Sequence, residues 1–226
     1  MKGKNAYKAT LDEIQKLVHQ DLKPNGFKKK GRTHNKTVDT GLIQAVNFQM
    51  GQFPIGDNYV VPGIRESYYG KFTVNLGVYV DELDELKGNK TRTFVQEYDC
   101  AIRKRLEHLT KGQDKWWTLD DNYEQTAQEI IDGLNSQGQT WFDLFDTRDK
   151  IVKNLQDKSY EFFLTPRAKL DAAIVQLNID RQDGERLFQE YYDSVDDKKP
   201  HKKYVADLMY RLKIKIKPAP SKTYKQ

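Results

Sequence analysis

Amide and phenol side chains occur at alternate positions in two stretches whose intervening positions are mostly apolar. These candidate binding residues are Asn47, Gln49, Asn75 and Tyr79. A period of two is typical of a β-strand, so we expect all four to share one face of a sheet. Amides and phenols make neutral hydrogen bonds, which suit the recognition of a peptide, a sugar or the edge of a base. The alternative is that a helix covers this face and bonds to the amides.

Basic and aromatic side chains form a second group of candidate binding residues. Arg103 and Arg105 lie two residues apart, and Lys28 to Lys30 form another basic run. Such cations could hold phosphate, but basic residues at a sheet edge also prevent edge-to-edge pairing. Trp116 and Trp117 are adjacent and cannot both face one side of a strand. We therefore expect one in the core and the other over a groove or at a helix start; the alternative buries both against the later helices.

The sequence contains no recognisable catalytic or metal-binding motif. Cys100 could act as a nucleophile only beside a base, and His108 lies eight residues further on. The histidines and the single cysteine show neither H-x-x-x-H nor C-x-x-C spacing, and neither common glycine-rich phosphate-binding motif is present. We therefore predict no cofactor, no metal and no catalytic residue, and interpret Cys100 as a small buried hydrophobe.

The elements that must position these residues follow from the spacing of apolar side chains. Leu42 to Met50 and Phe72 to Val80 alternate as strands do, whereas Tyr7 to Leu22 shows helical spacing that ends before Pro24. From Leu119 onward, the apolar residues again recur at helical spacing. The sequence therefore predicts an α+β fold: an N-terminal helix packed on an antiparallel sheet, followed by a helical C-terminal half.

The change of pattern after residue 118 suggests how the chain is organised. We expect an α+β sheet portion at 1–118, a helical portion packed on or beside it at 119–217, and a disordered basic tail at 218–226. From Lys198 onward there are ten lysines and arginines and one acid, so the rest of the chain is net negative although the whole carries +5. Such an end attracts polyanions or is simply solvated. Gly51 to Gly70 is a long predicted loop, which favours a functional role.

The composition also predicts where the protein resides. A single cysteine fits a reducing compartment, and no apolar run approaches the roughly 20 residues of a membrane span. The first residues lack the apolar centre of a signal peptide. We therefore expect a cytoplasmic protein with no membrane partner.

Five motifs in succession resemble a bacterial family catalogued as domain of unknown function 4304. The matching segments are Gly26 to Gly31, Val46 to Gln49, Phe72 to Tyr79, Cys100 to Leu106 and Asp114 to Trp117. The resemblance covers roughly Thr10 to Phe145. It implies the family's fold type and a bacterial, intracellular setting, and it supplies no catalytic residues.

These observations lead to three hypotheses of function. The first is a non-enzymatic module that binds another protein, as immunity or accessory proteins do, through the amide-and-aromatic sheet face. The second is a nucleic-acid-binding protein that uses its basic groups and aromatic stacking. The third is an enzyme acting on a small polar ligand in a cleft walled by the Gly51 to Gly70 loop.

Overall fold

The structure, a computed structural model, describes residues 3–51, 60, 67–86, 88, 90–112, 115–157 and 167–217. The chain divides into two compact units, Met1–Asp146 and Thr147–Gln226. The change of sequence pattern at residue 119 falls within the first unit. Most of the predicted loop Gly51 to Gly70 and the whole predicted tail 218–226 lie outside the described residues. Within the described part of the chain, no helix is both long and apolar enough to cross a membrane.

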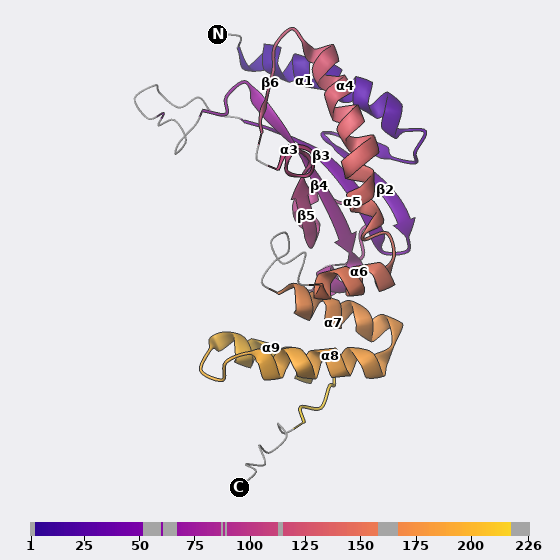
Figure 1. Cartoon of the computed structure of the whole chain (residues 1–226), viewed down its shortest axis with the longest axis vertical. Coiled ribbons are helices and arrows are strands. Elements are labelled where there is room, and N and C mark those ends of the chain that lie inside the picture. The colour runs from indigo at the N-terminus through magenta and orange to yellow at the C-terminus, as the bar shows by residue number, and fades with distance from the viewer. Residues whose placement is uncertain are drawn as a thin grey trace. The chain divides into compact units, whose positions relative to one another are not determined.

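In its described residues the first unit combines a six-stranded sheet with helices, which confirms the predicted α+β fold (Figure 1). Its strands are β1 (Lys28–Lys30), β2 (Thr33–Asp39), β3 (Leu42–Met50), β4 (Lys71–Val80), β5 (Ile102–Arg105) and β6 (Trp117–Thr118). Its helical elements are α1 (Lys4–Leu22), α2 (Asp81–Glu85), the 3-10 turn η2 (Glu97–Asp99), α3 (Leu106–Lys111), α4 (Tyr123–Gly133), the π-helical segment η3 (Leu134–Gly138) and α5 (Gln139–Asp143).

The sheet order follows the chain, β1-β2-β3-β4-β5, and β6 also pairs with β4. All these pairings are antiparallel. The two strongly alternating segments are neighbours: β3 and β4 pair along their whole length, from Leu42 opposite Val80 to Met50 opposite Phe72. The spacing of apolar residues from Cys100 to Leu109 does not distinguish a strand from a helix. In the structure this segment forms strand β5 followed by helix α3.

One face of the sheet carries the core of this unit. Phe48, Val74 and Leu76 are at most 1% exposed on this apolar face. Helix α1 packs beside α4 (Figure 1) and contributes its own apolar row, because residues three or four apart share one side of a helix. The buried members of that row are Leu11, Ile14, Val18 and Leu22.

Helix α1 ends where the sequence predicts. Its last residue is Leu22, just before Pro24, and Gly26 then takes a left-handed φ of +90° that L side chains rarely adopt. This reversal returns the chain to the sheet as β1. Phe27 is buried at the junction and lies 6.4 Å, centroid to centroid, from the ring of Phe142.

The second unit is helical in its described residues. Its helices are α6 (Arg148–Gln156), α7 (Ala168–Ile179), α8 (Arg181–Ser194) and α9 (Pro200–Arg211). Thr147 and Asp180 begin α6 and α8 as N-caps: their side-chain oxygens accept hydrogen bonds from the backbone N–H groups of Lys150 and Asp183. The sequence also predicts a helix that starts at Pro166, but this residue lies outside the described residues.

Candidate functional site

The face of the sheet opposite the core carries the amides that the sequence groups together. Asn47 lies directly opposite Asn75 and Gln49 lies opposite Thr73, so these side chains share one face, here called the polar face. Nδ2 of Asn75 donates to Oε1 of Gln49 at 2.9 Å. Asn75 is buried whereas Gln49 is exposed. The amide that reaches solvent is therefore held in place by a buried one.

A segment far away in the sequence covers one end of the polar face. Residues 95–100, here called the cover segment, lie over β2, β3 and β4 and include η2. The side chain of Asn35 accepts from the backbone N–H of Val95 at 2.7 Å and donates to the carbonyl of Val95 at 3.1 Å. Thr33 donates to Oε1 of Gln96 at 2.6 Å, and Nδ2 of Asn47 donates to Thr33 Oγ1 at 2.8 Å. Thr33 and Asn35 of β2 thus hold this cover in place.

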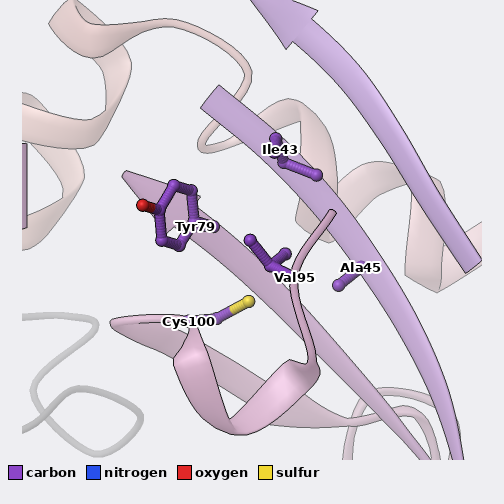
Figure 2. Packing of buried hydrophobic residues seen from close by; sticks show 5 residues of the cluster. All are labelled: Ile43, Ala45, Tyr79, Val95 and Cys100. Carbon is purple, nitrogen blue, oxygen red and sulfur yellow. The ribbon is translucent and has the colours of Figure 1, made fainter. Parts of the chain in front are cut away.

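Tyr79 lies under the cover segment and is not a surface residue. Its side chain is fully buried in a cluster with Ile43, Ala45, Val95 and Cys100 (Figure 2). Its hydroxyl donates to the carboxylate of Asp84 at 3.2 Å. Burial and the nearby Asp84 charge raise the pKa of Tyr79 to about 12. The prediction of a phenol available for recognition is therefore wrong at this position, because the ring belongs to a second, smaller core.

The thiol of Cys100 fills space that a glycine leaves open. A Cβ added at Gly77 would lie 2.7 Å from Sγ of Cys100 and 2.9 Å from its Cβ. Cys100 is 5% exposed, so the structure places it as the small buried residue that the sequence suggests. Among the described residues, no group of three or more His, Cys, Asp or Glu side chains could hold a metal ion.

The two predicted arginines lie on the polar face as well. Arg103 and Arg105 are opposite Gly77 and Asn75 in the β4–β5 pairing, so they project to the same side as the amides. Nη1 of Arg103 lies 3.6 Å from a carboxylate oxygen of Glu97 in η2. The side chain of Arg103 is 52% exposed, so the contact leaves much of the guanidinium in solvent.

The adjacent tryptophans lie on opposite sides of the sheet. Trp117 is 5% exposed and stacks on Phe72 of the apolar face at 5.5 Å between ring centroids. Its Nε1 donates to Oε2 of Glu129 on α4 at 3.1 Å. Trp117 is therefore the member of the pair that lies in the core, and it is not exposed for binding. Trp116 faces the other way, half-buried, with the Arg105 guanidinium 5.7 Å from its ring centroid.

Two exposed tyrosines that are not among the residues predicted from the sequence lie beside this group, Tyr68 against Trp116 and Tyr98 next in sequence to Glu97. Tyr68 stacks on Trp116 with 4.3 Å between centroids and an interplanar angle of 29°, and it is 41% exposed. Tyr98 lies in η2 on the cover segment and is 72% exposed. Tyr68 falls in the aperiodic predicted loop, and Tyr98 falls in a segment with no regular spacing. No sequence signal therefore separated them from the other eleven tyrosines.

Glu107 is a buried carboxyl at the other end of the polar face. It lies in the first turn of α3 and is fully buried, with the Thr73 hydroxyl 3.4 Å from each carboxyl oxygen. Burial raises the pKa of Glu107 to about 7, although backbone N–H groups, Thr73 and Arg105 partly offset that effect. At neutral pH a substantial fraction of this side chain is therefore uncharged.

His34 is the corresponding buried base on the apolar face. It is fully buried on β2, with its ring 5.2 Å from that of His19 and 5.7 Å from that of Phe48. Neither ring nitrogen makes a hydrogen bond of normal geometry among the described residues. Burial, then the charges of His19 and Lys29, lower the pKa of His34 to about 4. The imidazole is therefore neutral at physiological pH.

Gln44 departs from the other amides in the alternating strands. It lies on the apolar face, next but one to Val46, and is 2% exposed. Its side-chain oxygen lacks a hydrogen-bond partner in the described part of the chain. Gln44 is therefore unavailable for recognition from solvent.

The second unit has a surface cavity that contains none of the predicted site residues. The cavity has a volume of about 280 Å³, and its lining residues are Gln156, Lys169, Leu187, Glu190, Tyr191 and Ser194. Glu190 is paired with Arg186 at 2.7 Å, and the hydroxyl of Tyr191 is 2.8 Å from Nε2 of His201. The side chains of Glu190 and Tyr191 therefore already have partners within the second unit.

Comparison with known proteins identifies the family. Residues 18–144 match the model of a family described as a domain of unknown function, DUF4304. Because the match covers more than half of the chain, this protein belongs to that family, as the succession of motifs predicts. Neither the curated proteins nor the solved structures include a match to it.

Proposed function

We propose that the chain is a non-enzymatic module that binds another protein through the solvent-exposed part of its polar face. This surface, here called the recognition face, comprises Gln49, Tyr68, Tyr98, Arg103, Arg105 and Trp116. The observation that carries the proposal is the contact of Trp116 with Tyr68 on one hand and Arg105 on the other. Tryptophan, tyrosine and arginine are the residue types that dominate the binding energy of protein interfaces.

The support beneath this surface favours binding without large rearrangement. Gln49 is held by Asn75, and the cover segment that carries Tyr98 is fixed by both polar groups of the Asn35 side-chain amide. Side chains already held in one conformation lose less entropy on binding, so more of the contact energy appears as affinity. The Tyr79 cluster lies beneath the cover segment and supplies its apolar anchor.

The proposal can be tested by photo-crosslinking in the native host. Tyr98 is replaced by the photoreactive aromatic p-benzoylphenylalanine, and Glu124, exposed on α4, is replaced in a separate control chain. Glu129 of α4 accepts a hydrogen bond from Trp117, which stacks on Phe72 of the apolar face, so the control position on α4 samples the opposite side of the sheet. We expect a discrete protein adduct at position 98 that is absent at position 124.

A second variant links that adduct to the recognition face. Trp116→Ala removes the ring that contacts both Tyr68 and Arg105, so we expect the position-98 adduct to be lost while the circular dichroism spectrum is retained. Adducts of equal yield at both positions would refute the proposal. So would a position-98 adduct that persists unchanged in the folded Trp116→Ala chain.

A further inference from the structure

We propose that the partner presents an acidic surface to the recognition face, with carboxylates directed at Arg103 and the basic edges of the sheet. This inference rests on the proposed function and adds the chemistry of the partner. It follows from which charged side chains of the polar face are exposed to solvent and which are buried.

Basic side chains occur at both edges of the polar face. On β1, Lys28 and Lys30 lie opposite Asn35 and Thr33, so they project to this face, and the whole strand is exposed. On β5 at the other edge, Arg103 projects to the same face with 52% of its side chain exposed. A surface bordered by cations on two sides attracts negative charge over distances comparable to the Debye length.

The acidic side chains on this side are much less exposed to solvent than Lys28, Lys30 and Arg103. Glu97 lies 3.6 Å from Arg103, and Asp99 and Asp84 each lie 3.1 Å from Arg92, with only 16%, 11% and 4% of these acidic side chains exposed. Glu107 is fully buried and has its pKa raised to about 7. The exposed charge of the polar face is therefore mainly positive, which favours an acidic partner.

The arrangement of these charges favours a protein over a nucleic acid. Strands β1 and β5 are four strand spacings apart, roughly 19 Å at about 4.8 Å per spacing. Between them the cover segment carries Glu97, Asp99 and the exposed ring of Tyr98. A phosphate chain that bridged the two basic edges would carry charge across the intervening span, where the exposed Tyr98 ring offers it no cation. A folded protein can instead place separate acidic side chains at each edge.

The test measures association kinetics with the protein captured at position 98. That partner is purified, and its binding is followed by stopped-flow at about 50 mM and about 500 mM salt. The wild type is compared with Arg103→Gln and Arg103→Glu, and Lys8→Glu on α1 serves as a matched charge-reversal control on an exposed residue. The neutral variant keeps the inference testable if the reversed charge disturbs Glu97.

We expect the association rate at low salt to fall in the order wild type, Arg103→Gln, Arg103→Glu, with at least about a tenfold loss for the last. High salt should largely remove these differences, and Lys8→Glu should match the wild type. Equal rates for all chains, or losses that salt does not reduce, would overturn the acidic partner while leaving the binding module intact. An adduct at position 98 that nuclease rather than protease destroys would overturn both proposals in favour of nucleic acid.

Discussion

Two buried ionisable groups of the first unit should make opposite contributions to the pH dependence of its stability. The unfolded chain protonates His34 near its ordinary value of 6.5, whereas the folded protein does so only near 4. Between these values the unfolded state binds more protons, so His34 lowers stability as the pH falls. Glu107 keeps its proton in the folded protein up to about 7, whereas the unfolded chain loses it near 4.5. Glu107 therefore lowers stability as the pH rises through that range.

The size of each effect follows from the intervals between these pKa values. Each interval spans about 2.5 pH units, which at 1.36 kcal/mol per unit corresponds to about 3 kcal/mol for each group. Both side chains are fully buried, so solvent screens these contributions little. From about pH 4.5 to 6.5 the two slopes have opposite signs and nearly cancel. We therefore expect these two groups together to add little net slope to the wild-type profile there.

Single substitutions should reveal each slope separately. As the pH rises from 4.5 to 7, the unfolding free energy of Glu107→Gln should increase by about 3 kcal/mol relative to that of the wild type. As the pH falls from 6.5 to 4, that of His34→Phe should increase by a similar amount. Urea unfolding followed by tryptophan fluorescence measures these differences, because all three tryptophans lie in the first unit. Glu124→Gln, at an exposed position on α4, is the control and should show no such trend. Differences from wild type that do not change with pH would refute this reasoning.

Three further substitutions test packing, backbone strain and an ion cluster. Gly77→Ala places a Cβ 2.7 Å from Sγ of Cys100, so urea unfolding should show a loss of about 1–3 kcal/mol that Cys100→Ala partly restores. Lys213 has a left-handed φ of 58°, so Lys213→Gly should stabilise the second unit by up to about 1 kcal/mol in thermal unfolding; a loss would contradict the strain argument. Although burial opposes its charge, hydrogen bonds from two lysines and Trp117 lower the pKa of Glu129 to about 2. Glu129→Gln should therefore lower the free energy of unfolding by about 1 kcal/mol at pH 7, after allowance for the exposure of this side chain. This loss should disappear as the pH falls from 4.5 toward 2. A loss that persists at pH 2 would argue against the ion cluster.

The alternation of apolar residues was enough to predict the central strands and the grouping of three amides. Residues opposite one another on paired strands must share a face, so Asn47, Gln49 and Asn75 lie together whatever surrounds them. The same rule placed Arg103 and Arg105 on that face once β5 paired with β4. Local spacing therefore determined to which face of the sheet each side chain projects.

What covers each face depends on segments distant in the sequence, and alternation carries no information about them. Tyr79 is buried because Val95 and Cys100 pack over it, and these residues belong to a segment without regular spacing. Tyr98 belongs to the same segment, so its exposure could not be predicted from alternation either. Gln44 shows the converse case: alternation places it on the apolar face with Leu42 and Val46, but only the packing over that face shows that it is buried.

The most direct test of the recognition face is the affinity of the captured partner for the Trp116→Ala chain, measured by isothermal titration calorimetry. If Trp116 is the centre of the interface, its truncation should cost at least about 2 kcal/mol, equivalent to roughly a 30-fold weaker Kd. Glu124→Ala, on the opposite side of the sheet, should bind as the wild type does. A folded Trp116→Ala chain that binds within about twofold of wild type would contradict the assignment of this surface.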